Sequence, residues 1–276
     1  MTLEFAGLRL DRPRIMGIVN VTPDSFSDGG ETATAEAAVA RGLAMAAAGA
    51  DIVDVGGEST RPGAAPVPPA AEAARVVPVV RALAAAGLPV SVDTRRAAVM
   101  AAATAAGARI INDVSALSHD PDALATAAAS GAAVILMHMR GTPETMMDLA
   151  RYGDVAGEVA AELAARVDAC VAAGIPRARL AVDPGIGFAK TAAHNVALLA
   201  GLGGVKARLG LPLVLGVSRK RFISRLDRDV EAHGRLAGSV AAALAGVARG
   251  ADILRVHDVA ETRQALAVWR AIADHG

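Results

Sequence analysis

Side chains suited to binding chemistry follow directly after short apolar runs of this chain. Three of them, Asp93, Asn112 and Asp183, are carboxylates or an amide in the middle of the sequence. A carboxylate can accept two parallel N–H bonds from a ligand edge that carries an N–H beside an NH2 group. An amide next to it can both donate and accept. These residue types suit a flat, nitrogen-rich heterocycle.

A second group of side chains, late in the chain, is basic. It consists of Arg219, Lys220, Arg255 and His257. Guanidinium groups match the geometry of phosphate oxygens. The segment Glu58-Ser59-Thr60-Arg61 adds a hydroxyl and another guanidinium. We therefore expect anion binding beside the heterocycle pocket.

Each polar position also has a simpler structural interpretation. Asp93 could cap a following helix, and Asp183-Pro184-Gly185 is a plausible turn. We interpret His138 as a hydrogen-bonded core histidine rather than a catalytic group. Cys170, in a helical stretch over residues 167–173, is interpreted as a buried, inert thiol. The structural explanation competes at any single position, but packing alone does not require a polar group after nearly every apolar run.

The elements that must position these groups follow a repeated pattern. An alanine-rich helical stretch, a glycine and a short β-branched run recur, and glycine just past a helix takes the left-handed conformation without strain. The glycines are Gly49, Gly87, Gly107, Gly131, Gly174, Gly210 and Gly250. The runs after them contain residues 51–55, 89–92, 109–111, 133–137, 179–182, 212–217 and 252–256. Runs apolar on both sides are typical of parallel strands covered by helices.

With a strand at residues 15–19, these units predict about eight strands, each followed by a helix. Such α/β alternation is typical of a (β/α)8 TIM barrel, here with a short N-terminal β-hairpin within residues 2–12. A doubly wound open sheet is the alternative, but no G-x-G-x-x-G turn follows an early strand. We find no linker and predict a single domain over residues 1–276. Catalytic groups of such barrels lie at the carboxyl ends of the strands.

Composition limits the class of protein. With 28 basic and 28 acidic residues the formal net charge is zero, which gives no electrostatic case for binding nucleic acid or a membrane surface. The single cysteine excludes an intrachain disulfide and fits a reducing compartment. No uncharged run reaches the ~20 apolar residues of a membrane helix. Glu4 and the absence of a long apolar leader are not typical of a signal peptide, so we expect a cytoplasmic protein.

Several motifs resemble those of dihydropteroate synthases. They occupy residues 16–30, 54–63, 91–94, 112–113, 136–139, 183–190, 218–220 and 253–259. The resemblance runs in order through residues 14–268, and the motifs in the loops after the first two strands are the most specific. One departure is Ala189, where the family more often has glycine before the lysine.

The resemblance implies an enzyme of folate biosynthesis. Such an enzyme condenses (7,8-dihydropterin-6-yl)methyl diphosphate with 4-aminobenzoate to give 7,8-dihydropteroate and pyrophosphate. It implies Mg²⁺ as the cofactor and favours a homodimer. An alternative stays open: a pterin-binding barrel that serves as a methyl-transfer or non-catalytic module. That module would not need a diphosphate site, so Thr60-Arg61, Arg219-Lys220 and the loop at residues 23–30 favour the synthase.

The resemblance also implies roles for individual residues. The pterin would contact Asp93, Asn112, Asp183, Lys220 and Arg255. Asn20 would bind Mg²⁺, and the diphosphate would contact Thr60, Arg61, Arg255 and His257. The 4-aminobenzoate would lie between Phe26 and the Arg61-Pro62 turn on one side and Phe188, Ser218 and Arg219 on the other. Met137 and Gly216 complete the predicted substrate-binding set. For Phe26, a lid over the substrate and an anchor on the barrel rim are both open.

Overall fold

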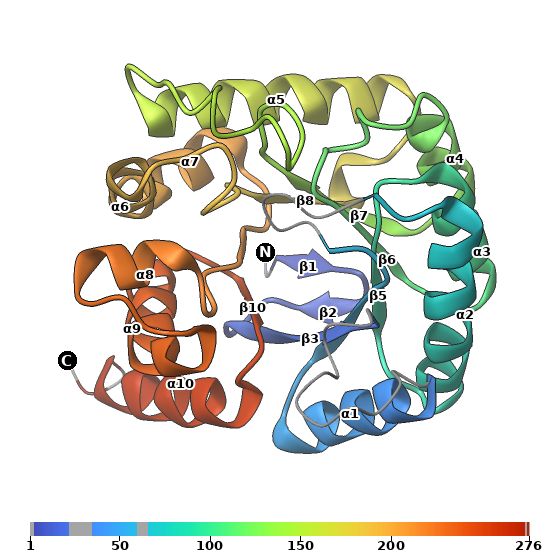
Figure 1. Ribbon diagram of the computed structural model, residues 1–276, viewed down its shortest axis with the longest axis horizontal. Coiled ribbons are helices and arrows are strands. Elements are labelled where there is room, and N and C mark those ends of the chain that lie inside the picture. The colour runs from blue at the N-terminus through green and yellow to red at the C-terminus, as the bar shows by residue number, and fades with distance from the viewer. Residues whose placement is uncertain (1–2, 22–34, 60–65, 274, 276) are drawn as a thin grey trace.

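A computed structural model describes residues 3–21, 35–59, 66–273 and 275 of the chain. Eight parallel strands form the sheet that surrounds the centre of the molecule (Figure 1). They are β3 (Arg14–Asn20), β4 (Ile52–Gly56), β5 (Val90–Asp93), β6 (Ile110–Asp113), β7 (Ala133–Met137), β8 (Leu180–Asp183), β9 (Val214–Leu215) and β10 (Ile253–Val256). Their order in the sheet is β8-β7-β6-β5-β4-β3-β10-β9. A single parallel bridge between Val182 and Leu213 joins β8 to β9. The predicted barrel is therefore confirmed, and β9 is shorter than the predicted run.

Helices cover the outside of the barrel (Figure 1). They are α1 (Ala35–Ala48), α2 (Pro69–Ala85), α3 (Ala97–Ala105), α4 (Ala123–Ser130), α5 (Val155–Ala172), α6 (Ala192–Ala200), α7 (Leu202–Leu209), α8 (Arg221–Leu226), α9 (Leu236–Val247) and α10 (Val259–Ala273). Short 3-10 turns lie at Arg177–Arg179 and Ala232–Arg235. The predicted glycine stops all have left-handed φ values, between 59° and 111°. Each glycine ends a helical stretch and turns the chain into the next strand.

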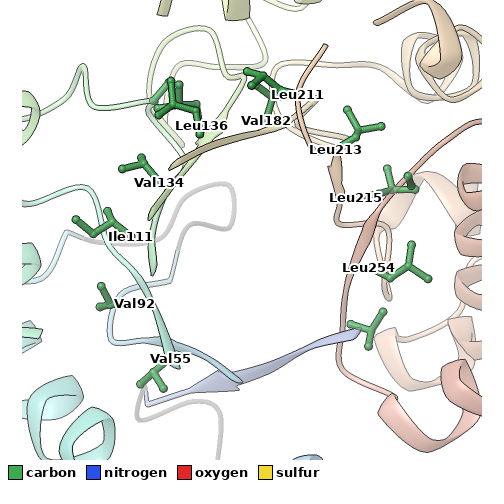
Figure 2. Packing of buried hydrophobic residues seen from close by; sticks show 14 of the residues in the cluster. Val55, Val92, Ile111, Val134, Leu136, Val182, Leu211, Leu213, Leu215 and Leu254 are labelled. Carbon is green, nitrogen blue, oxygen red and sulfur yellow. The ribbon is translucent and has the colours of Figure 1, made fainter. Parts of the chain in front are cut away.

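Two apolar cores follow from the period of two along each strand. Side chains on the outer face, among them Val55, Val92 and Leu254, pack against the helices (Figure 2). Side chains on the inner face fill the barrel and include Met16, Ile52, Ile110, Ala133, Ile135, Ala181, Val214 and Ile253. The antiparallel strands β1 (Glu4–Phe5) and β2 (Leu8–Arg9) form the predicted hairpin. Phe5 of this hairpin packs onto the inner core, so one end of the barrel is filled by apolar side chains.

Candidate functional site

On five strands the inner face of the barrel changes from apolar side chains to site residues within two positions. The apolar members Ile52, Ile110, Ala181, Val214 and Ile253 belong to the inner core. Two positions further toward the carboxyl ends, on the same face, lie Asp54, Asn112, Asp183, Gly216 and Arg255. The alternation of the strands therefore brings residues from five strands to one end of the barrel above an apolar floor, as in TIM-barrel active sites.

Register places four of these strand ends side by side. Asn20 pairs with Gly56, Gly56 with Asp93, and Asp93 with Asn112 across β3 to β6. A Cβ atom on Gly56 would lie 3.7 Å from Asp93 Oδ2 and 3.8 Å from Asn20 Oδ1. The absence of a side chain at Gly56 thus leaves both oxygens facing the same small space. The helix-cap interpretation of Asp93 is wrong, because α3 begins at Ala97 and Arg96 occupies its N-cap position.

Arg255 is held between two carboxylates. Its Nε donates to Asp54 Oδ2 at 2.6 Å and its Nη2 donates to Asp93 Oδ2 at 2.6 Å. Burial alone would lower the pKa of Arg255, but the two carboxylates raise it above its usual range. Burial raises the pKa of Asp93 to about 7, with Asp54 adding to the effect and Arg255 opposing it. Arg255 is therefore a permanent cation, and Asp93 beside it binds a proton more readily than a free aspartate does.

Asp54 is a site residue that the sequence analysis missed as an individual position. It lies inside β4 rather than at its end, and its side chain is fully buried. Besides Arg255 it contacts Asn112, whose Nδ2 donates to Asp54 Oδ2 at 3.1 Å. A carboxylate flanked by Val53 and Val55 in a buried strand was the available signal, since an ionised group is buried only when it is paired.

Asp183 and Lys220 face each other across Gly216. Asp183 Oδ1 accepts a hydrogen bond of 2.7 Å from the Gly185 backbone, which is the predicted turn. Its Oδ2 lies 3.7 Å from the place that a Cβ on Gly216 would take, and Lys220 Nζ lies 3.7 Å from the same place. The glycine therefore keeps open the space beside an acceptor and a donor. Lys220 also donates to the carbonyl of Ile186, and its Nζ lies 4.7 Å from the centre of the Phe188 ring.

Burial shifts both charged groups toward their neutral forms. It raises the pKa of Asp183, although Lys220 opposes this effect. It lowers the pKa of Lys220 to about 8, again against the pull of Asp183. A ligand that makes hydrogen bonds to the carboxylate would favour its ionised form. The pair is thus suited to a polar, uncharged ligand edge.

The last strand ends contain fewer free cations than the sequence analysis expected. His257 Nδ1 lies 3.0 Å from Ser218 Oγ, and burial beside Arg255 lowers the pKa of His257 to about 3. His257 is therefore neutral in the free protein, and its contact with the diphosphate stays a prediction. Arg219 donates to Asp258, with 3.0 Å between Nε and Oδ2. Its role in binding substrate stays a prediction, because binding must compete with this ion pair.

A buried network behind the site includes Lys190, which the sequence analysis also missed. Lys190 Nζ contacts His138 Nδ1 at 2.9 Å, the Gly185 carbonyl at 3.1 Å and the Phe188 carbonyl at 2.9 Å. His138 Nε2 lies 3.0 Å from Glu162. Burial and Lys190 lower the pKa of His138 to about 4, so this histidine is neutral. The interpretation of His138 as a hydrogen-bonded core residue is confirmed; its partner Lys190 belongs to the loop that contains Phe188.

Ala189, the departure from the family pattern, has an unusual backbone conformation. It is fully buried and adopts a left-handed φ of 50°. This region disfavours a residue with a Cβ by roughly 1–2 kcal/mol, which is a physical reason to expect glycine here, as the family resemblance implies. Cys170 is buried in α5, and burial raises the pKa of its thiol to about 11. The predicted burial of this thiol is confirmed, and its inertness stays a prediction.

Four predicted site residues, Phe26, Thr60, Arg61 and Pro62, lie outside the described residues. The ends of the second loop are described. Glu58 accepts a hydrogen bond of 2.8 Å from the Val67 backbone and an ion pair of 2.7 Å from Arg96. Arg95 Nε also donates to Glu58 at 3.0 Å. A single carboxylate thus fixes both ends of this loop next to the barrel mouth.

Asn20 Oδ1 is an oxygen at the mouth that suits a divalent metal, because Mg²⁺ prefers oxygen ligands. Asp93 Oδ2, on the other side of Gly56, already accepts from Arg255 Nη2 at 2.6 Å. Within the described ranges, no three His, Cys, Asp or Glu side chains form a cluster that could hold a metal. Mg²⁺ often uses one or two protein ligands together with substrate phosphates, so the donor set suits a metal that arrives with a diphosphate.

Comparisons with known proteins agree with this geometry. A family model described as pterin binding enzyme matches residues 16–257. Dihydropteroate synthase of Neisseria meningitidis serogroup B is 51% identical over 95% of this chain and 94% of its own length. The Xanthomonas albilineans dihydropteroate synthase structure with 4-aminobenzoic acid has a TM-score of 0.91 at 53% identity, over 99% of this chain and 98% of that one. Its complex with 7,8-dihydropteroate has a TM-score of 0.87 at 50% identity, over 96% and 95% of the two chains.

The barrel and the polar ring at its carboxyl end define a pterin binding enzyme. Within that class, the chain belongs to the dihydropteroate synthase family. The chain is therefore a transferase of the pterinylmethyl group. In the part of the chain that the structure describes, no helix is long and apolar enough to cross a membrane.

Proposed function

We propose that the carboxyl end of this barrel condenses (7,8-dihydropterin-6-yl)methyl diphosphate with 4-aminobenzoate, giving 7,8-dihydropteroate and pyrophosphate. The observation that carries the proposal is the open space at Gly216, which lies between Asp183 Oδ2 and Lys220 Nζ, each 3.7 Å from the Cβ position. This space holds a carboxylate acceptor and an ammonium donor above an apolar floor. Solved structures of relatives hold 4-aminobenzoic acid, one of these reactants, and 7,8-dihydropteroate, the proposed product, which supports the proposal.

Asp183 and Asn112 recognise the edge of the pterin. The Oδ2 of Asp183 accepts N–H bonds from the amino-pyrimidine edge, and Lys220 donates to an acceptor on the same ring. Asp93, in the same layer as Asn112, contacts the ring from the next strand. Arg255 contributes a fixed positive charge, because Asp54 and Asp93 hold its guanidinium in place. Met137, which pairs with Asp183 across β7 and β8, adds an apolar contact.

The reaction breaks the bond between the pterin methylene carbon and the diphosphate oxygen, and it forms a bond from that carbon to the arylamine nitrogen. The electron pair of the broken bond leaves with pyrophosphate, and the nitrogen loses a proton to solvent. Arg255 stabilises the charge that develops on the leaving group. Neither Ser218, which contacts His257, nor the buried Cys170 is needed as a nucleophile. The chain's residues bind, orient and neutralise charge.

Asn20 would hold Mg²⁺ at the mouth, and the bound metal would supply charge neutralisation to the diphosphate. Thr60, Arg61 and His257 would complete the diphosphate site. The 4-aminobenzoate would pack against Phe188, Ser218 and Arg219, with Phe26 and Pro62 on the opposite side. Arg219 can reach the substrate carboxylate only by exchanging part of its contact with Asp258.

The experiment that tests the proposal is an end-point assay with both substrates and Mg²⁺. Purified protein should release pyrophosphate only when both substrates are present, and mass spectrometry should detect 7,8-dihydropteroate in equal amount. Pyrophosphate release without 4-aminobenzoate would indicate a hydrolase. Pterin binding without any condensation would support the methyl-transfer or non-catalytic module instead.

The metal is tested separately. EDTA should abolish turnover, while a 6-hydroxymethylpterin without phosphates should bind with nearly unchanged affinity, because the metal would contact only the diphosphate. Calorimetry with and without EDTA measures this. Equal loss of turnover and of pterin affinity would indicate a structural metal, and undiminished turnover in metal-free buffer would remove Mg²⁺ from the proposal.

A cytoplasmic homodimer is the proposed assembly. Its support is the apolar surface of α10, where Val268 and Ile272 are 58% and 70% exposed. They are four residues apart and so share one face of the helix. The helices α8, α9 and α10 lie together on one side of the barrel (Figure 1), which offers a continuous helical surface to a second copy.

A further inference from the structure

Asp54 is a buried carboxylate that does not contact the substrate in the proposed reaction. Its Oδ2 accepts two hydrogen bonds, one of 2.6 Å from Arg255 Nε and one of 3.1 Å from Asn112 Nδ2. The donors come from β10 and β6, which are not neighbours in the sheet. A single oxygen atom therefore contacts two residues of the proposed pterin site from different sides of the barrel.

We infer that Asp54 is a positioning residue that decides which end of the Asn112 amide faces the pterin, and that it thereby sets part of the substrate specificity. The inference rests on the proposed function, because it takes the ligand to be a pterin. It concerns a step before chemistry, in which the protein selects the hydrogen-bond pattern of the ring.

The argument begins with what an amide can present. An asparagine side chain offers an NH2 group on one side and a carbonyl oxygen on the other, and a half-turn about its last bond exchanges them. An ionised carboxylate only accepts hydrogen bonds. Asp54 therefore requires the NH2 group of Asn112 on its own side, and Asn112 Oδ1 turns the other way. Among the described residues, no group donates to Asn112 Oδ1, so this oxygen is available to an N–H of the ligand.

The neighbouring guanidinium makes this choice unambiguous. Arg255 is fixed by Asp54 on one side and Asp93 on the other. Its positive charge also compensates for the cost of burying a carboxylate at position 54, where the side chain is fully buried. Without Asp54, Asn112 would lose the acceptor that orders its amide, and both amide orientations would become available to a ligand.

A specificity measurement separates this role from simple stabilisation of the barrel. The probes are 6-hydroxymethylpterin and its 2-oxo analogue, in which a carbonyl replaces the 2-amino group, titrated by calorimetry without phosphate or metal. A site that hydrogen-bonds an amine rejects an analogue that lacks it, by roughly 100-fold or more when partners are left unpaired. Asp183 supplies part of this preference, and an ordered Asn112 oxygen supplies the rest.

Asp54→Val removes the acceptor while keeping a similar shape. The ratio of the affinities for 6-hydroxymethylpterin and its 2-oxo analogue should fall by roughly tenfold, as expected for the loss of one hydrogen bond. Asp54→Asn can still place an oxygen toward Arg255 and Asn112, and should retain most of the preference. Ser91→Ala is the matched control, since Ser91 pairs with Asp54 in register, is fully buried, and its Oγ has no hydrogen-bond partner within the described part of the chain. It should leave the preference unchanged.

The outcomes distinguish the inference from the function on which it rests. A folded Asp54→Val protein that melts earlier but keeps the wild-type ratio of affinities would overturn the positioning role. Failure of the wild-type protein to bind 6-hydroxymethylpterin would instead refute the proposed function. If Asp54→Val does not fold, Asp54→Ser gives the same measurement, because its shorter side chain withdraws the oxygen from both donors.

Discussion

At the scale of single residues, Gly216 shows how the absence of a side chain creates part of a binding site. A Cβ at this position would lie 3.7 Å from Asp183 Oδ2, 3.7 Å from Lys220 Nζ and 4.0 Å from Arg255 Cβ. These are ordinary contact distances, so the free protein has room for a methyl group. A ligand edge that reaches Asp183 needs the same room. Alanine can therefore replace Gly216 without disturbing the fold, but its methyl group would occupy the space that the ligand needs.

Gly216→Ala should consequently separate binding from folding. We expect the affinity for 6-hydroxymethylpterin to fall at least roughly tenfold, about 1.4 kcal/mol, with little change in melting temperature. Gly204→Ala is the control: a Cβ there meets no atom within 4 Å in α7. It should leave affinity unchanged and stabilise the helix by roughly 0.5–1 kcal/mol. Equal pterin affinity in wild type and Gly216→Ala would place the ligand elsewhere.

Asp183→Asn tests the acceptor itself. One of the two carboxylate oxygens becomes an NH2 group, and a buried donor left facing an N–H of the ligand costs roughly 1–3 kcal/mol. The affinity for 6-hydroxymethylpterin should fall by the corresponding factor in calorimetry. Circular dichroism should show an unchanged fold. Undiminished affinity in a folded variant would contradict the assignment of Asp183 to the pterin edge.

At the scale of elements, Lys190 joins the loops that follow β7 and β8. Its ammonium donates to two carbonyls of its own loop and to His138 of the preceding one. Because Lys220 donates to the Ile186 carbonyl, two lysines together order the segment that contains Phe188. Burial and the neighbouring Lys220 lower the pKa of Lys190 to about 7. The loop geometry and the charge of its buried lysine are thus coupled.

The coupling predicts a pH dependence of stability. A lysine in the unfolded chain keeps its proton up to about pH 10.4, whereas folded Lys190 releases it near pH 7. Between these values the unfolded chain binds more protons, so the free energy of unfolding rises with pH. Lys190→Met should lower stability by at least roughly 1–3 kcal/mol, since buried carbonyls lose their donor. It should also remove this rise between pH 7 and 9. The measurement is urea unfolding of both proteins at several pH values between 7 and 9. An equal change in the free energy of unfolding with pH in both proteins would contradict the prediction.

At the scale of the whole molecule, the helical side formed by α8, α9 and α10 is where a second copy would bind. Helices α9 and α10 contact each other. The exposed stripe of α10 at Val268 and Ile272 is not used by that packing. It is the part of the surface on which the proposed homodimer depends.

Ile272→Asp should therefore disrupt association. Sedimentation of the wild-type protein should give twice the chain mass of 27.7 kDa, and the variant should shift toward a single chain mass, because a charge at an apolar interface is costly. Leu43→Asp, at a 43% exposed position of α1, is the control and should sediment like the wild type. A wild-type protein that sediments as a single chain at micromolar concentration would refute the homodimer.

The sequence by itself determined the order of elements and the polar strand ends. Glycine after each helical stretch is a local conformational requirement, and the β-branched runs indicate buried strands without knowledge of the fold. Asn112 and Asp183 were identifiable because they end such runs. The hairpin of residues 4–9 and the histidine at position 138 were likewise interpreted correctly from local patterns.

Only the tertiary structure decided which of these groups are partners. Asp54 and Arg255 are separated by 201 positions, and Lys190 and His138 by 52. No local preference encodes such pairs, because strand register and barrel closure bring them together. Desolvation is also a property of the assembled barrel: it makes His257 neutral and moves the pKa of Asp93 to about 7. The sequence identifies the side chains of the site, but their charge and orientation depend on burial and on neighbours from distant strands.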